Sequence, residues 1–243
     1  MTPELPAAGR GRYDAAREHR SSQRPAMLNQ HCEEDFSSPF LSPLLHRLAQ
    51  RGRTCHYRPG ALLIQEGDHD DTIFILLAGR VRAFSAGDKG QEITYGVYGP
   101  GEYLGELSLD GGPRSASVIT LERCTCTLVS RQTVLEHIAQ HPEFAFELLS
   151  KVIRRVRSAT MNARQLALND VYGRLIYMVN TVSEPSGDGT RVIHERWTHK
   201  ELSSRLGCSR AMVSRLLKDL ETGGYVRLEP QRFVICRPLP ARW

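Results

Sequence analysis

The 243-residue chain lacks any apolar run near the ~20 residues that a membrane-spanning helix needs. Residues 1–26 also lack the continuous apolar core of a signal peptide. Hydrophobic residues make up 40% of the chain and charged residues 24%, as in ordinary globular proteins. These absences predict a cytoplasmic protein with no membrane contact, and the length suits one or two domains.

Metal-binding and catalytic motifs are absent as well. The six cysteines include no C-x-x-C pair, which argues against a zinc ribbon or a local iron–sulfur cluster. There is no G-x-S-x-G elbow, no P-loop lysine motif and no H-E-x-x-H pair. We therefore expect no enzyme activity, no metal site and no obligatory cofactor.

Positive charge is concentrated near the C-terminus. Residues 191–237 contain ten Lys and Arg against five Asp and Glu, an excess equal to the whole chain's net charge of +5. A local basic surplus of this kind favours an acidic partner such as DNA.

Changes in composition and periodicity divide the chain into four parts. Residues 1–27 are rich in arginine and small residues and predict a flexible arm. Short β-branched or aliphatic segments separated by glycines then predict a β-roll or jelly-roll domain over residues 28–141. Residues 142–168 predict a long helix and hinge, and residues 169–243 a DNA-binding domain.

The predicted long helix carries a narrow apolar stripe with alternating spacings of four and three residues. Its members are Ala145, Leu149, Val152, Val156, Ala159, Ala163 and Leu166. A narrow stripe flanked by arginines is typical of a two-stranded coiled coil, so we expect a dimerisation helix. The alternative is a helix that packs only against its own chain.

Residues 198–220 predict two helices joined by a tight turn. Thr198 and Glu201 form a capping box, Gly207 provides the turn, and Ser209 caps the second helix. At about 100° per residue, one side of the second helix is apolar and the other polar. The apolar side consists of Val213, Leu216, Leu217 and Leu220.

The polar side of the second helix has the chemistry that reads the major groove, where arginine can bond to guanine and cap amides can hold a phosphate. A hairpin with its turn at residues 229–231 follows, which completes a winged helix-turn-helix. The predicted DNA contacts are Thr198, Lys200, Ser209, Arg210, Ala211, Ser214, Arg215 and Lys218.

Two pairs of motifs resemble the Crp/Fnr family of bacterial transcription regulators. The first is Gly105-Glu106-Leu107 followed by Pro113-Arg114-Ser115-Ala116, and the second is Gly207-Cys208-Ser209-Arg210 followed by Val213-x-Arg215. The resemblance extends over about residues 30–237. It implies an α+β protein with an N-terminal cyclic-nucleotide-binding-type β-roll, a long dimerisation helix and a C-terminal winged helix-turn-helix domain.

The resemblance also implies a cradle for a cyclic phosphate. Gly105 would let the backbone approach the ligand, Glu106 would accept from a ribose hydroxyl, Arg114 would neutralise the phosphate and Ser115 would add a donor. Leu107 and, from the dimerisation helix, Thr160 would complete the ligand contacts.

Three departures from the family pattern leave the ligand and the operator open. The spacer at residues 108–113 is shorter than the usual family loop, and Ala159 replaces one of the two hydroxyl residues that meet adenine in cAMP-responsive members. Cyclic AMP, cyclic GMP, cyclic di-GMP or no effector therefore remain alternatives. Ala211 replaces the family's usual glutamate, which accepts a hydrogen bond from cytosine, so the identity of one base pair in the half-site is also left open.

The sequence as a whole indicates a homodimeric transcription regulator that binds a palindromic operator in double-stranded DNA and contacts RNA polymerase. The leading hypothesis places an effector in the β-roll. The alternative is an effector-independent regulator whose β-roll has lost its ligand. The sequence does not decide between activation and repression.

Overall fold

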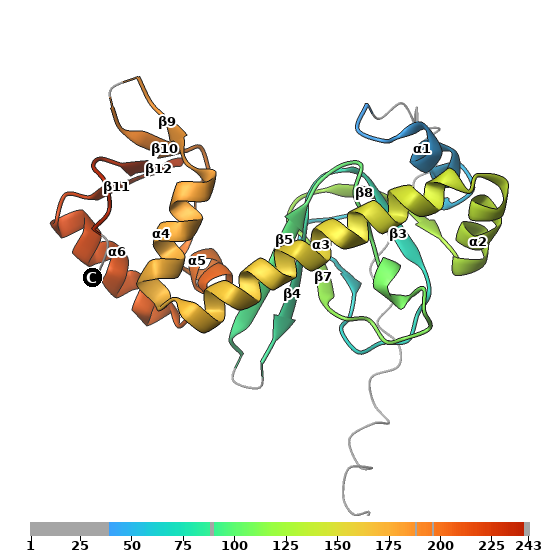
Figure 1. Ribbon diagram of the computed structural model, residues 1–243, viewed down its shortest axis with the longest axis horizontal. Helices are drawn as coiled ribbons and strands as arrows, with labels where there is room; N and C mark the ends of the chain where they lie inside the picture. Colours follow the sequence, from blue (N-terminus) through green and yellow to red (C-terminus); the bar gives the residue numbers. More distant parts are fainter. Residues whose placement is uncertain (1–38, 88–89, 188, 196, 241–243) are drawn as a thin grey trace, which may run out of the picture.

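The chain forms a β-rich domain and a smaller, mostly helical domain joined by one long helix (Figure 1). The computed structural model describes residues 39–87, 90–187, 189–195 and 197–240. The predicted arm at residues 1–27 lies outside these ranges. The arrangement confirms the predicted α+β class.

Two four-stranded antiparallel sheets enclose the core of the β-rich domain, in the orders β1-β8-β3-β6 and β2-β7-β4-β5. Both sheets contribute buried side chains to it, for example Leu76 and Cys126 from the first and Val81 and Val118 from the second. The strands are β1 (Arg53–Tyr57), β2 (Leu62–Ile64), β3 (Ile73–Ala78), β4 (Val81–Ala86), β5 (Glu92–Tyr98), β6 (Tyr103–Leu104), β7 (Ser117–Thr120) and β8 (Cys124–Val129).

Three helices close one end of this β-roll, namely α1 (Pro43–Ala49), α2 (Arg131–Gln140) and the first turns of α3 (Glu143–Leu168). Their apolar side chains, including Leu45 and Phe144, form a second core against the β3–β6 edge. Ser42 caps α1 and donates from its hydroxyl to the Glu147 carboxylate at 2.8 Å. The N-terminal part of α3 is thereby held to the domain.

The long helix α3 crosses the β-roll and continues toward the second domain (Figure 1). It ends where the sequence predicts a break, because Asp170 caps α4 (Val171–Val182) by accepting from the Gly173 amide at 2.7 Å. None of the described helices, α3 included, is both long and apolar enough to cross a membrane.

The second domain is a winged helix-turn-helix, as predicted. Its elements after α4 are β9 (Glu184–Pro185), β10 (Arg191–Ile193), α5 (His199–Leu206), α6 (Arg210–Thr222), β11 (Val226–Glu229) and β12 (Arg232–Ile235). Gly207 adopts the left-handed conformation (φ 62°) between α5 and α6. The four predicted apolar residues of α6 are all buried in the domain core.

The second domain docks on the β4–β5 hairpin of the first through α5. Ser204 is 3% exposed, and its hydroxyl lies 2.6 Å from the hydroxyl of Thr94 and 3.4 Å from a guanidinium nitrogen of Arg82. Glu92 pairs with both Arg82 (2.8 Å) and Lys200 (3.5 Å). Burial alone would raise the pKa of Glu92, but these two cations outweigh it and lower the pKa.

A carboxylate at position 204 should separate the two domains. Ser204→Glu puts a much larger side chain where Ser204 is 3% exposed and removes the serine partner of the Thr94 hydroxyl, and each unsatisfied buried polar group costs about 1–3 kcal/mol. We expect hydrogen–deuterium exchange to rise at least about tenfold in the amides of both β5 and α5. Thr222→Glu, at the exposed end of α6, is the control. Unchanged exchange in the Ser204 variant would contradict the docked arrangement.

Candidate functional site

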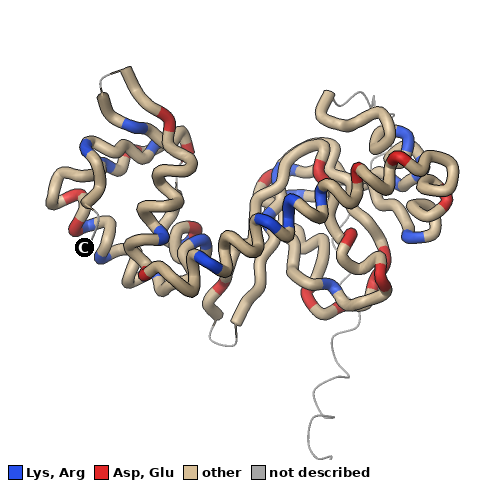
Figure 2. The backbone as a smooth tube through the Cα atoms, in the orientation of Figure 1, with Lys and Arg blue, Asp and Glu red and all other residues tan. Residues whose placement is uncertain are grey.

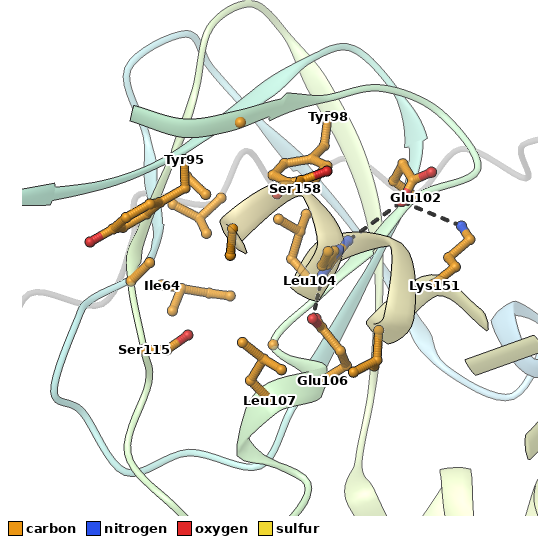
Figure 3. Close-up of a pocket in the computed structure, with 18 of the residues that line it drawn as sticks. Ile64, Tyr95, Tyr98, Glu102, Leu104, Glu106, Leu107, Ser115, Lys151 and Ser158 are labelled. Carbon is orange, nitrogen blue, oxygen red and sulfur yellow. Dashed lines mark hydrogen bonds and ion pairs between the residues drawn. The ribbon is translucent and has the colours of Figure 1, made fainter. Parts of the chain in front are cut away.

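A cavity of about 760 Å³ lies between the β-roll and the middle of α3. Its β-roll wall comes from β5, the single-turn helix η1 (Glu106–Ser108) and the chain around Arg114, and its other wall comes from α3. Glu102 and Glu106 point from the β-roll toward α3, while Tyr95 and Ser115 lie across the cavity from them (Figure 3). The five predicted ligand residues between Gly105 and Ser115 all line it.

Gly105 fixes the start of η1 because its backbone is left-handed, with φ 91°. A Cβ atom at this position would lie 2.3 Å from the Arg114 Nη1 atom and 2.7 Å from the Thr72 carbonyl oxygen. Glycine is therefore required here both for the backbone angle and for the space that the Arg114 side chain fills.

Arg114 is 3% exposed and braces the loops that form the cavity wall. Its guanidinium donates to the carbonyl oxygens of Thr72 (2.7 Å) and Gly105 (3.0 Å) and pairs with Asp70 at 3.3 Å. Burial would raise the pKa of Asp70, but hydrogen bonds from Thr72 and the Arg114 charge outweigh it and lower that pKa. The loops are thus organised around one buried positive charge.

Glu106 forms an ion pair with Arg155 of α3, across the cavity. The Glu106 side chain is 3% exposed and that of Arg155 20%. Arg155 also donates to the Tyr103 carbonyl oxygen at 2.6 Å and stacks 4.8 Å from the Tyr98 ring centre. Burial would lower the pKa of Arg155, but Glu106 outweighs it and raises the pKa.

A second pair joins the same two walls. The Lys151 ammonium of α3 lies 3.4 Å from the Glu102 carboxylate and donates to the Gly101 carbonyl oxygen at 2.6 Å. Burial lowers the pKa of this ammonium although Glu102 opposes the shift. Figure 2 shows Lys and Arg grouped where α3 crosses the β-roll. Arg155 also lies 3.4 Å from Glu102, so three ion pairs hold α3 in one register on the domain.

Thr160 does not line the cavity of its own chain, unlike the other predicted ligand residues. It is exposed, and its hydroxyl donates back to the Val156 carbonyl oxygen at 2.9 Å. Ser158, Ala159 and Asn162 are the α3 residues that line the cavity at this level. Because successive residues are rotated by about 100°, Thr160 points away from the β-roll.

The predicted apolar stripe of α3 divides between the cavity and the exposed side of the helix. Val152, Val156 and Ala159, which the sequence places on the dimer seam, line the cavity. Exposed apolar residues on α3 include Leu149 (52%), Val156 (58%) and Leu166 (44%) of the predicted stripe, with Phe146 (73%) and Ile153 (40%) beside them. The dimerisation helix stays a prediction, because periodicity alone does not say which apolar residues of α3 its own domain covers.

The sequence also missed Arg155 and Lys151 as cavity residues. Both occur beside the apolar stripe, where arginine and lysine are usually solvated. Their partners Glu106 and Glu102 are about fifty residues away in the chain, so no local pattern reveals the pairs.

A second candidate surface lies on the exposed side of α6. Arg210, Ala211, Ser214, Arg215 and Lys218 are all exposed, as predicted. Within the described part of the chain, the charged groups of Arg210, Arg215 and Lys218 have no hydrogen bond or ion pair. These three cations are therefore free to meet an acidic partner.

The remaining predicted DNA contacts have partners within the protein. The Thr198 hydroxyl belongs to the capping box with Glu201, and the Ser209 hydroxyl accepts from the Met212 amide at 3.2 Å. Lys200 pairs with Glu92 of the β-roll at 3.5 Å. No group of three or more His, Cys, Asp or Glu side chains suited to a metal ion occurs among the described residues.

A helix-turn-helix with a basic, exposed second helix, joined by α3 to a β-roll with a cavity, is the architecture of a DNA-binding transcription regulator. Family models match both halves of the chain. Residues 54–141 match a cyclic nucleotide-binding domain, and residues 171–238 match a Crp-like helix-turn-helix domain.

The chain is also similar to characterised regulators. It is 30% identical to a CRP-like cAMP-activated global transcriptional regulator of Mycobacterium tuberculosis over 72% of this chain and 80% of the relative. It is 32% identical to a cyclic AMP receptor protein of Thermus thermophilus over 78% of this chain and 90% of the relative. The chain therefore belongs to the Crp/Fnr family of transcription regulators.

Solved structures share the fold. The c-di-GMP-responsive global regulator CLP of Xanthomonas campestris superposes with a TM-score of 0.71 at 23% identity, covering 80% of this chain and 98% of its own. A CooA mutant from Carboxydothermus hydrogenoformans gives a TM-score of 0.68 at 16% identity, covering 85% and 93%.

Replacing Gly105 with alanine should destabilise the protein more than the same change at Gly60. Both glycines have left-handed backbones, which cost alanine about 1–2 kcal/mol, but a Cβ at Gly60 meets nothing within 4 Å. At Gly105 the Cβ also displaces the buried Arg114 guanidinium. We expect the Gly105→Ala variant to melt several degrees below Gly60→Ala in thermal denaturation. Equal melting temperatures would show that the Arg114 side chain does not need the space left by the missing Cβ of Gly105.

Proposed function

We propose that the protein is a homodimeric regulator whose operator binding is controlled by a cyclic nucleotide or cyclic dinucleotide in the cavity. The observation that supports this most strongly is the composition of the cavity wall. One side is η1 with the Arg114 loop, and the other is α3, the helix that leads into the helix-turn-helix domain. A ligand between these walls would contact both the β-roll and the element that positions α6.

The residues present fit a cyclic phosphate. Arginine has five N–H donors, and Arg114 uses only part of them on the Thr72 and Gly105 carbonyl oxygens. The Ser115 hydroxyl lines the same wall and adds a donor, while Glu106 can accept from a ribose hydroxyl. The cavity volume of about 760 Å³ lies within the usual range for small-molecule sites.

The α3 wall sets the choice among ligands. Ala159 offers a base only a methyl group, whereas Arg154 and Asn162 line the cavity with polar groups. Cyclic AMP, cyclic GMP and cyclic di-GMP are the candidates, and the names of the relatives from Mycobacterium tuberculosis and Xanthomonas campestris mention cAMP and c-di-GMP for those proteins.

Dimerisation would cover the exposed apolar stripe of α3. Phe146, Leu149, Ile153 and Val156 are spaced by three, four and three residues, the spacing of a coiled-coil seam. Thr160 continues this stripe four residues after Val156, so the hydroxyl would face the partner subunit. A two-fold axis along α3 would present two α6 helices to successive major grooves of a palindromic operator. A cytoplasmic location and a contact with RNA polymerase accord with this role.

A second candidate is a regulator that binds DNA without an effector. Both side chains expected to hold the ligand already have partners in the protein, since Arg114 binds two carbonyl oxygens and Glu106 pairs with Arg155. In that case the β-roll would serve as a scaffold for dimerisation and for contacts with RNA polymerase.

Titration calorimetry with cyclic AMP, cyclic GMP and cyclic di-GMP distinguishes the two candidates. We expect at least one ligand to bind with micromolar or tighter affinity. Ser115→Asp should weaken that binding by about ten- to hundredfold, because it removes a donor and adds a negative charge beside the phosphate. Arg157→Gln makes the same change in net charge on the exposed side of α3 and should leave the affinity unchanged.

Absence of heat with all three ligands would contradict the effector-controlled function and favour the ligand-independent regulator. Equal weakening by Ser115→Asp and Arg157→Gln would place the ligand outside the cavity.

A further inference from the structure

His199, which is not among the predicted DNA contacts, is hydrogen-bonded to the exposed side of α6. Its imidazole Nδ1 lies 2.8 Å from the hydroxyl oxygen of Ser214. His199 is the first residue of α5, and Ser214 lies in the second turn of α6. Both side chains are exposed. The bond therefore joins the beginning of one helix to the middle of the other on the molecular surface.

The surroundings of this pair match those of a DNA-reading surface. Arg210 lies four residues before Ser214, and Arg215 and Lys218 extend the same exposed side of α6. Ala211, one turn before Ser214, offers only a methyl group to a base edge. Ser214 is thus the one uncharged hydrogen-bonding side chain among the exposed residues of α6 between Arg210 and Lys218.

A serine hydroxyl has one donor and two acceptor positions, so alone it can bond to either kind of base-edge group. When the hydroxyl donates its one hydrogen to an imidazole nitrogen, only its acceptor positions remain to bond to a base. The bond to His199 also holds the Ser214 side chain in one rotamer.

We propose that His199 is a positioning residue that makes Ser214 an acceptor toward the operator. Oriented in this way, Ser214 binds a base that presents an amino group in the major groove, which is N6 of adenine or N4 of cytosine. Guanine O6 and thymine O4 are acceptors at the corresponding positions and are disfavoured. This inference rests on the proposed DNA-reading role of α6 and adds a class of base to it.

The DNA itself favours the required form of the imidazole. When Nδ1 accepts from Ser214, the proton of the neutral ring is on Nε2, which is then a donor. In the other neutral tautomer the proton is on Nδ1, and Nε2 would then turn a lone pair toward the negative phosphate backbone. Of the two neutral tautomers, the backbone potential therefore favours the one in which Nε2 donates outward and Nδ1 accepts from the Ser214 hydroxyl.

Two conservative variants separate the two ring nitrogens. In His199→Asn the amide oxygen takes the place of Nδ1 and can still accept from Ser214. In His199→Gln the amide reaches the place of Nε2 and leaves the Nδ1 position empty. Ser214→Ala removes the hydroxyl that is proposed to bond to the base, and Thr222→Ala, at the exposed end of α6, is the control.

The experiment begins with selection of a preferred half-site from a randomised DNA library by the full-length wild-type protein. Fluorescence anisotropy at pH 8 then gives the affinity for every single-base change. We expect the wild type to prefer adenine or cytosine at one position by about five- to hundredfold. Ser214→Ala and His199→Gln should lose this preference at that position alone, while His199→Asn and Thr222→Ala keep it.

Two results would overturn the inference while leaving the proposed function intact. The first is a preference that depends on Ser214 but survives in His199→Gln. The second is a uniform loss of affinity for all sequences in the His199 variants, which indicates a structural role only. Failure of the wild type to enrich any sequence would overturn the DNA-reading role of α6, and this inference with it.

Discussion

The ion pair between Glu106 and Arg155 is the interaction on which the arrangement of the two domains depends. Both side chains are largely removed from water, where a lone charge is costly and a paired one is tolerated only with further hydrogen bonds. Arg155 has those bonds in the Tyr103 carbonyl oxygen and the Tyr98 ring. Arg155 also lies 3.4 Å from the Glu102 carboxylate, but loss of Arg155 would leave Glu106 buried without its cation. The pair therefore holds α3 to one register on the β-roll.

The helix-turn-helix domain is connected to that register in two ways. The first is covalent, through α3 and the Asp170 cap to α4. The second is the docking of Ser204 and Lys200 on the β4–β5 hairpin. β5 also contributes to the cavity wall, so both connections begin at the cavity. In the proposed mechanism a ligand that competes for Glu106 and Arg155 shifts a two-state equilibrium in the position of α6.

The DNA-binding domain was predicted from sequence almost element by element, because caps such as Thr198 and turns such as Gly207 are encoded within a few residues. The cavity was predicted on its β-roll side from the motif around Glu106, and on its α3 side only at Ala159, which lines it, and at Thr160. Arg155 was missed because its partner is distant in sequence. Thr160 does not line the cavity of its own chain, so its ligand contact stays a prediction. The Ser204 docking had no signal in sequence, since it joins two domains.

Under the proposed function, occupation of the cavity changes DNA binding through α3. The most direct test measures operator affinity of the full-length protein with and without whichever of cyclic AMP, cyclic GMP and cyclic di-GMP binds, in the wild type and in Arg155→Met. We expect a five- to 150-fold change for the wild type, the usual size of allosteric coupling, and little or none for the variant. A ligand that binds the wild type without altering operator affinity would contradict this coupling between the cavity and α6.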